Sequence, residues 1–303
     1  MRPNPPAGPW TRGIRDRPVR DRPVRDRPVR DRRVRERGHH SKGDDMASAA
    51  TAIVNRPAWV DLSSSDPAAS RAFYAKLFGW DVEVTADPQY GGYAMAKVGG
   101  KDVAGIGPTQ SPGAPTAWML YIGTPDAENL ATEVRAAGGS VIAPPFDVGD
   151  QGRMAVFQDP AGAFISAWQP TNMTGFFTGA ANTFAWAELN ARGMEKSIPF
   201  YNHVFGWTAM TRPMGEGMGD YTEFQLGGVS LAGGVEMNAR VPAEVPSYWM
   251  VYFGVADVDG AYQAALGAGA REMLPPRDFP GGRFAIVGDP QGAAFGLLRM
   301  AAG

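Results

Sequence analysis

AWVDLSSSDPAASRAFYAKLFGW occupies residues 58–80, and AWAELNARGMEKSIPFYNHVFGW occupies residues 185–207. Both stretches begin with a tryptophan in a short strand-like segment, carry a Phe-Tyr pair in the middle and close with Phe-Gly-Trp. In the first stretch Ser65-Asp66-Pro67 combines a capping side chain with a proline at the first helical position, and Gly79 favours the end of the helix. Each stretch therefore predicts a strand, a helix and a second strand.

The similarity continues beyond these stretches. Trp118-Met119-Leu120-Tyr121 matches Trp249-Met250-Val251-Tyr252, and Asp159-Pro160-Ala161-Gly162 matches Asp289-Pro290-Gln291-Gly292. The spacing between matching residues is 127 at the first tryptophan and 131 at the later one, so the second copy contains small insertions. Self-similarity of this kind indicates two copies of one structural unit, of about 110 residues each, joined near residues 169–182.

Each copy divides into two smaller units of one strand, one helix and three strands. Helical spacing of apolar residues predicts helices at 69–79 and 127–137 in the first copy and at 194–205 and 258–266 in the second. Alternating or β-rich runs predict strands in the first copy at 58–62, 80–84, 93–98, 103–106, 117–122, 141–143, 154–158 and 163–168. Gly99-Gly100 is typical of a hairpin turn between two of these strands.

The order and duplication of these motifs resemble the vicinal oxygen chelate (VOC) superfamily, which contains glyoxalase, bleomycin-resistance and dioxygenase-like proteins. The resemblance extends over residues 56–300 and includes the double-domain glyoxalase-like antigens and so-called hydroxylases of actinobacteria. It implies an α+β fold with two tandem domains, each made of two βαβββ units that form a curled eight-stranded cup around a ligand. We expect the domains at residues 46–174 and 175–303, packed on each other as an intramolecular pseudo-dimer.

The resemblance also places four metal-ligand positions in each cup, and their residues cannot coordinate a metal. They fall on the pairs Trp59 and Trp186, Gly105 and Gly233, Trp118 and Trp249, and Ser166 and Gly296. The chain has no cysteine and only three histidines, of which His39 and His40 lie in the N-terminal tail and His203 lies in a predicted helix. Zinc and iron sites usually need two or three imidazole or thiolate donors. We therefore expect no metal and no cofactor.

Tryptophan at four of these positions suggests a different use of the cup. Indole rings from Trp59, Trp118, Trp186 and Trp249 would give it aromatic walls that suit planar or cationic organic ligands. The alternative is that the four rings fill the cup and leave no pocket.

Strand periodicity places one carboxylate beside a tryptophan in each copy. Asp61 shares a strand face with Trp59, and Glu188 shares one with Trp186. Burial raises the pKa of a carboxyl group unless a cation compensates it, and Arg153 and Arg283 are the expected cations. Such a pair would orient a polar ligand group or act as a general base; the alternative is an ion pair that only fixes the fold.

Composition separates the chain into two parts. Residues 1–45 hold fourteen Lys and Arg against seven Asp and Glu and repeat Arg-Asp-Arg-Pro-Val, which predicts a disordered tail. Met46 is an alternative translation start. Aspartate in each repeat and the lack of interleaved aromatic residues argue against nucleic-acid binding. We find no signal peptide and no apolar run of about 18 residues, so we expect a cytoplasmic protein without a membrane partner.

Two functional hypotheses follow. The first is a metal-independent protein that binds and sequesters an aromatic or polar-aromatic small molecule, using Trp59, Trp118 and Arg153 in one cup and Trp186, Trp249 and Arg283 in the other. The alternative is a glyoxalase-like lyase or isomerase, or an oxygenase (hydroxylase)-like enzyme, with Asp61 or Glu188 as the catalytic base.

Overall fold

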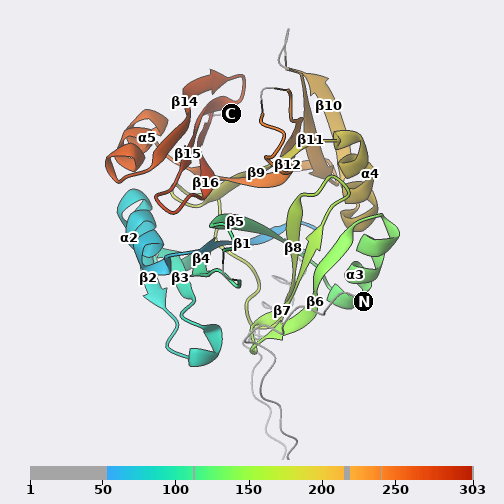
Figure 1. The fold of residues 1–303 in the computed structure, drawn as a ribbon, viewed down its shortest axis with the longest axis horizontal. Helices are drawn as coiled ribbons and strands as arrows, with labels where there is room; N and C mark the ends of the chain where they lie inside the picture. Colours follow the sequence, from blue (N-terminus) through green and yellow to red (C-terminus); the bar gives the residue numbers. More distant parts are fainter. Residues whose placement is uncertain (1–52, 112, 215–218, 240, 302–303) are drawn as a thin grey trace, which may run out of the picture.

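The computed structural model describes residues 53–111, 113–214, 219–239 and 241–301. Two α+β domains follow each other along the chain, each with one mixed eight-stranded sheet (Figure 1). The predicted disordered tail at residues 1–45 lies outside the described residues. None of the helices in the described ranges is long and apolar enough to cross a bilayer.

The two domains have the same order of elements, apart from one 3-10 turn. The first contains β1 (Pro57–Ser64), α2 (Pro67–Phe78), β2 (Asp81–Val84), the turn η2 (Pro88–Tyr90), β3 (Ala94–Val98), β4 (Lys101–Pro108), β5 (Ala117–Gly123), α3 (Ala127–Ala136), β6 (Ser140–Val148), β7 (Gly152–Gln158) and β8 (Phe164–Pro170). The second contains β9 (Phe184–Ala191), α4 (Met194–Phe205), β10 (Thr208–Pro213), β11 (Asp220–Leu226), β12 (Val229–Glu236), β13 (Tyr248–Gly254), α5 (Val258–Gly267), β14 (Arg271–Phe279), β15 (Gly282–Gly288) and β16 (Ala294–Met300).

Each sheet joins its two βαβββ units through one central antiparallel pair. The strand order is β2-β3-β4-β1-β5-β8-β7-β6 in the first domain and β10-β11-β12-β9-β13-β16-β15-β14 in the second. Strands β1 and β5 meet in the first sheet, and β9 and β13 meet in the second. The sheets curl into cups that open away from each other (Figure 1). The predicted fold class and the cup architecture are confirmed.

Helix α2 begins and ends as its sequence predicts. Asp66 is the N-cap and accepts a hydrogen bond from the Ala69 amide at 3.0 Å, Pro67 opens the first turn, and Gly79 ends the helix with φ of 66°. Helix α4 is capped differently, because its N-cap residue is Gly193, which has no side chain to accept a hydrogen bond. The carboxylate of Glu236, at the end of β12, accepts from the amides of Gly193 and Met194 instead. This tertiary cap has no signal in the local sequence.

The convex faces of the two sheets share one aromatic core. Trp118 of β5 contacts Phe253 of β13 edge to face at 4.9 Å between centroids, and Phe78 of α2 lies 5.1 Å from the same ring. Edge-to-face contacts at these distances are favourable in addition to the buried area. The buried cluster that contains these rings runs continuously through both domains, so the domains are stabilised together rather than separately.

A pair of tyrosine–aspartate hydrogen bonds crosses this interface in both directions. The Tyr74 hydroxyl of α2 donates to Asp289 at 3.0 Å, and the Tyr201 hydroxyl of α4 donates to Asp159 at 3.1 Å. Both aspartates belong to the Asp-Pro-x-Gly turns and are buried. Ser197 adds a second donor to Asp159 at 2.9 Å. Each domain thus places its turn carboxylate against the helix of the other.

Indole groups extend the same pseudo-symmetric arrangement. Trp80 donates to the carbonyl oxygen of Asn182, and Trp207 donates to that of Asn55, both at 2.7 Å. Asn55 and Asn182 are the only non-glycine residues with positive φ in the described part of the chain, and asparagine tolerates this conformation better than most residues. The tryptophans of both Phe-Gly-Trp motifs therefore anchor the segment that leads into the other domain.

We expect Tyr74→Phe to lower the free energy of unfolding by about 2–4 kcal/mol, because it removes a donor from buried Asp289 and the acceptor of the Trp118 indole. Tyr201→Phe is the matched control. It deletes the same atom, but Ser197 still donates to Asp159, so its cost should be about 1–2 kcal/mol smaller. Chemical denaturation measures both. Equal losses of unfolding free energy in the two variants would show that Ser197 does not compensate for the missing tyrosine hydroxyl.

Candidate functional site: a carboxylate with two phenols in each cup

The floor of the first cup is formed by neighbouring central strands. Trp59 and Asp61 project from the concave face of β1, where Trp59 lies opposite Tyr121 and Asp61 opposite Met119 on β5. On its other side Asp61 pairs with Gly105 of β4. The prediction that Asp61 shares a face with Trp59 is therefore confirmed.

Asp61 accepts two phenolic hydrogen bonds. The hydroxyl of Tyr93, which precedes β3, donates to its Oδ2 at 3.2 Å, and the hydroxyl of Tyr121 donates to the same oxygen at 3.0 Å. The Trp59 indole nitrogen donates in turn to the Tyr93 hydroxyl at 2.9 Å. Burial raises the pKa of Asp61 from 3.8 to about 6, although both phenols favour the ionised form. The carboxyl group therefore titrates close to neutral pH.

The second cup repeats this arrangement. The Trp186 indole nitrogen donates to the Tyr221 hydroxyl of β11 at 3.0 Å, and the Tyr252 hydroxyl of β13 donates to Glu188 at 3.1 Å. Burial raises the pKa of Glu188, and the hydrogen bond from Tyr252 opposes this shift. Indole, phenol, carboxyl and phenol groups thus occur in the same order in two domains whose surrounding residues have diverged.

Glycines on β4 and β12 make room for the first phenol of each network. A Cβ atom added to Gly105 would lie 1.7 Å from the Tyr93 hydroxyl, and one added to Gly233 would lie 1.9 Å from that of Tyr221. Both separations are far below any contact distance. The phenol therefore occupies the space that a β4 or β12 side chain would need, at the position where the family resemblance places a metal ligand.

The groups at the cup centres do not fit a catalytic metal. Each centre offers one carboxylate and two phenols, whereas zinc and iron sites usually need several imidazole, thiolate or carboxylate donors. Throughout the described ranges, no three His, Asp or Glu side chains are grouped closely enough to hold an ion. His203 is exposed on α4 and pairs with Glu133 at 2.8 Å, outside both cups.

Trp118 and Trp249 do not line the cups, so that part of the predicted site is wrong. Trp118 pairs with Leu62 across the β1–β5 ladder, on the convex face, and donates to the Tyr74 hydroxyl at 3.0 Å. Trp249 donates to the Tyr201 hydroxyl at 2.8 Å in the equivalent place. Both central strands are buried on the two faces, so their sequences lack the alternation that would reveal which residues face the ligand side.

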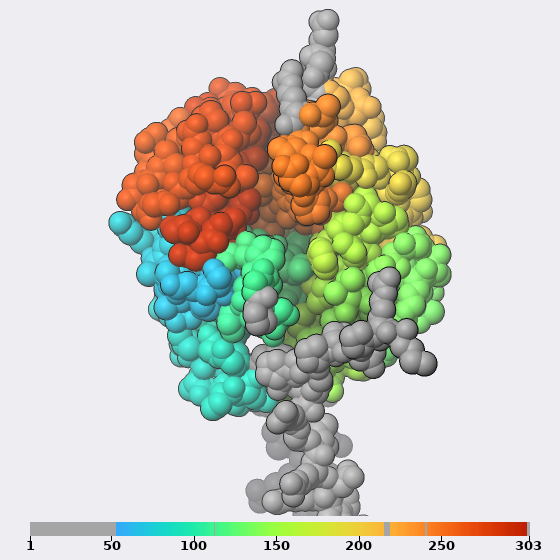
Figure 2. Space-filling view, viewed as in Figure 1, coloured from blue at the N-terminus to red at the C-terminus, as the bar shows by residue number. Residues whose placement is uncertain are grey.

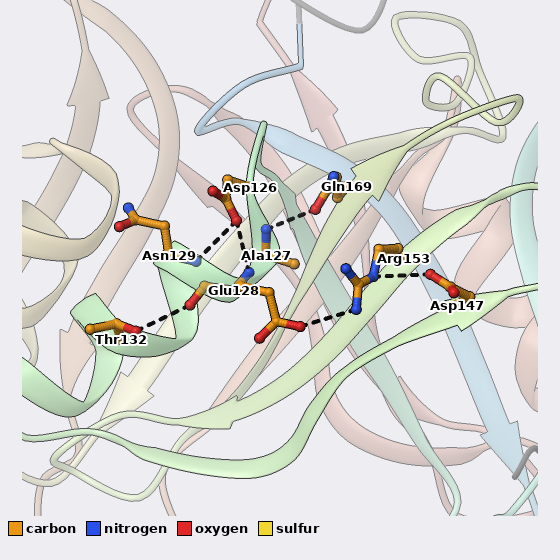
Figure 3. Close-up of polar contacts among 8 residues, drawn as sticks. All are labelled: Asp126, Ala127, Glu128, Asn129, Thr132, Asp147, Arg153 and Gln169. Carbon is orange, nitrogen blue, oxygen red and sulfur yellow. Dashed lines mark hydrogen bonds and ion pairs between the residues drawn. The ribbon is translucent and has the colours of Figure 1, made fainter.

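Arg153 and Arg283 do not reach the cup carboxylates either, and this prediction is also wrong. Arg153 binds Glu128 of α3 and Asp147 of β6, both at 3.0 Å (Figure 3). Arg283 pairs with Asp259 at 2.8 Å and Asp278 at 3.0 Å. Acidic partners on the adjacent helix and strand hold both guanidinium groups on the convex side. Phenols, not cations, compensate Asp61 and Glu188.

The chain segment between the domains packs into the first cup. The Met173 carbonyl accepts from the Trp168 indole at 2.8 Å, and Phe176 lies edge to face on Trp59 at 5.9 Å. Trp59 is consequently only 2% exposed. The interdomain segment, rather than the four tryptophan rings of the alternative hypothesis, therefore covers the first cup.

The second cup is less covered. Leu298 occupies the place of Trp168, and Trp186 is half-buried. Among the described residues, its buried cluster contains only side chains of the second domain itself. A recess is visible between the C-terminal strands (red) and the segment before β13 (orange) in Figure 2.

The tyrosines of both networks were absent from the predicted site. Tyr121 and Tyr252 lie in the repeated Trp-x-x-Tyr segments, so duplication alone could have drawn attention to them. Tyr93 and Tyr221 have a weaker signal. Tyr93 immediately precedes β3 and Tyr221 is the second residue of β11, and in both copies the partner strand carries a glycine. The segment that covers the first cup has no repeat equivalent to compare.

Comparison with known proteins agrees with this architecture. The chain belongs to the Glyoxalase/Bleomycin resistance protein/Dioxygenase superfamily, whose model matches residues 56–166 and 183–297.

Two relatives cover most of the chain. "Putative glyoxylase CFP32" of Mycobacterium bovis is 37% identical over 252 residues, which span 81% of this chain and 95% of the relative. "Anthracycline biosynthesis protein DnrV" of Streptomyces peucetius is 37% identical over 264 residues, which span 82% of this chain and 94% of the relative.

Solved structures share the fold at low identity. The Mn(II)-bound glyoxalase from Novosphingobium aromaticivorans has a TM-score of 0.59 and 16% identity, covering 82% of each chain. The 2,3-dioxygenase LapB from Pseudomonas sp. KL28 has a TM-score of 0.56 and 14% identity, covering 82% of this chain and 92% of LapB. These likenesses establish the arrangement of strands and helices.

The raised pKa of Asp61 predicts a specific pH dependence of stability. A carboxyl group with a pKa of 3.8 unfolded and about 6 folded stabilises the fold at low pH, and this contribution is lost as the pH rises through 6. Between pH 5 and pH 8 the wild type should lose about 1.4 kcal/mol that Asp61→Asn does not lose. Urea denaturation at several pH values measures the difference. Parallel pH profiles would contradict the assignment.

Gly233→Ala should destabilise the protein by about 2–3 kcal/mol, because the new methyl group collides with the Tyr221 ring and hydroxyl. Gly267→Ala is the control in the same domain, since nothing lies within 4 Å of its added Cβ atom. It should leave stability unchanged or raise it by up to about 1 kcal/mol at this helix end. Thermal or chemical unfolding compares the two, and a neutral Gly233→Ala would argue against the close tyrosine packing.

Proposed function

We propose that this protein binds an aromatic or polar-aromatic small molecule in the cup of its second domain, without a metal ion. The observation that carries the proposal is the network of Trp186, Tyr221, Glu188 and Tyr252 on a cup floor that the interdomain segment leaves uncovered. Indole and phenol rings supply flat apolar contacts, and the carboxyl group adds one polar contact whose character depends on its protonation.

The chemistry of the network defines the ligand. Tyrosine hydroxyls can both donate and accept hydrogen bonds. An ionised Glu188 only accepts hydrogen bonds, whereas its protonated form can also donate one. A planar ligand with hydroxyl or carbonyl groups on its rim satisfies these groups, while its ring faces contact Trp186. The name of the Streptomyces peucetius relative refers to anthracycline biosynthesis, and hydroxylated polycyclic quinones belong to this chemical class. The first domain then serves mainly as a structural support.

A carboxylate-dependent enzyme of the glyoxalase-like lyase or isomerase type, or an oxygenase-like one, is the second candidate. Buried carboxyl groups with raised pKa values favour it, because such groups are suited to proton transfer near neutral pH. Glu188 would be the base in the less covered cup. Conversion of an added ligand, detected by mass spectrometry of the mixture, would favour this candidate over binding alone.

The proposal predicts that chelator-treated protein binds a hydroxyanthraquinone probe with a stoichiometry of one. Glu188→Gln should weaken binding about tenfold near pH 8, since a hydrogen bond to a charged acceptor contributes about 1.5–3 kcal/mol. Asp61→Asn is the matched control, because the interdomain segment covers the first cup. Fluorescence titration or calorimetry measures the affinities.

Two outcomes would overturn the proposal. Equal effects of Asp61→Asn and Glu188→Gln would remove the distinction between the cups. Binding that disappears on chelation and returns with a stoichiometric transition metal would show that the ligand is held through an ion.

A further inference from the structure

A second hollow lies where the interdomain segment meets the start of β9. Its volume is about 540 Å³, within the range of about 300–1,000 Å³ that is usual for small-molecule sites. The walls come from four parts of the chain: residues 53–57, residues 176–180, the β9–β12 corner and Met300 at the end of β16. Trp186 is the one residue of the cup network that also lines this hollow.

The walls are mostly apolar and partly aromatic. Phe176 and Phe184 pack against each other with 5.3 Å between ring centroids, and Trp186, Leu231 and Met300 extend this surface. A planar ring system can contact such edges over a large fraction of its area.

One cation, Arg56, faces these apolar walls. Its side chain is half-buried and makes no ion pair or side-chain hydrogen bond with the described residues. Arg153 of β7 and Arg283 of β15 differ from Arg56, because each pairs with two carboxylates. A guanidinium group presents a fork of donors that matches a carboxylate, so Arg56 can hold an acid group at the edge of the hollow.

In the first domain the interdomain segment packs directly on the corresponding corner. There Phe177 donates its backbone N–H to the Asp102 carbonyl at 2.8 Å, and Lys101 lies 4.3 Å above the Phe177 ring. Asp102 corresponds in the repeat to Ser230, which lines the hollow in the second domain. The interdomain segment thus covers this corner in one domain and forms a wall of the hollow in the other.

We propose that this hollow is a binding site for an aromatic carboxylic acid, with the ring system against the wall formed by Phe176, Phe184 and Trp186 and the carboxylate on Arg56. The site shares Trp186 with the proposed ligand site in the second cup, but its carboxylate contact, Arg56, is not part of the cup network. It draws residues from both domains, so it exists only in the assembled tandem protein.

The test uses the full chain and two matched probes, 2-naphthoate and its neutral analogue 2-naphthamide, with calorimetry at neutral pH. The wild type should bind 2-naphthoate about tenfold more tightly, because one charge-assisted bidentate contact distinguishes the two probes. Arg56→Gln should abolish this preference, and Arg56→Lys should retain part of it. Ala180→Phe, which places a ring in the hollow, should weaken both probes at least about tenfold.

Two controls separate this site from nonspecific effects. Arg271→Gln removes an exposed arginine that does not line the hollow. Ala181→Phe adds a ring at the exposed alanine next to Ala180, which does not line the hollow either. Neither substitution should change the affinity for 2-naphthoate. Arg56→Gln should also leave binding of the hydroxyanthraquinone probe unchanged, so failure of one site does not imply failure of the other.

Three results would overturn the proposal. They are no binding of 2-naphthoate at millimolar concentration, an unchanged preference in Arg56→Gln, or decanoate binding as tightly as 2-naphthoate, which would mean that the hollow selects an aliphatic acid.

Discussion

Two buried carboxylates, Asp159 and Asp289, hold this molecule together. A carboxyl group inside an apolar interface is strongly destabilising unless hydrogen-bond donors surround it, and here each one accepts hydrogen bonds from backbone amides of its own turn and from a tyrosine hydroxyl of the other domain. Because the donors come from both sides, the convex faces of the sheets must meet in one orientation. As a result, both concave faces point away from the interface between the two sheets.

On the concave faces, two further buried carboxyl groups are stabilised in a different way. Asp61 and Glu188 lie among aromatic rings, and phenols take the role that a metal ion or a guanidinium group would otherwise have. Phenols leave the carboxyl group free to change its protonation, as the raised pKa of Asp61 indicates. A metal would instead keep it ionised. The glycines under Tyr93 and Tyr221 show that this arrangement constrains neighbouring strands as well.

The repeat made most of the fold predictable. Strand and helix positions, including α4 at Met194–Phe205, follow from periodicity, capping residues and the comparison of two copies. Only part of the site was predictable. Asp61 and Trp59 lie on β1, and their shared face follows from strand periodicity alone. Trp118 was placed on the wrong face because β5 is apolar on both sides, and Arg153 was misassigned because its partners Glu128 and Asp147 come from elements that only the folded chain brings together.

The segment that closes the first cup has a consequence for how the two halves can change. A symmetric homodimer of single domains would expose identical cups, and any residue altered for one ligand would alter both. Here the connecting chain passes through one cup only, with Met173 and Phe176 as its contacts. Fusion has therefore broken the symmetry: a substitution at a residue that contacts the connecting chain in the first cup has no counterpart in the second.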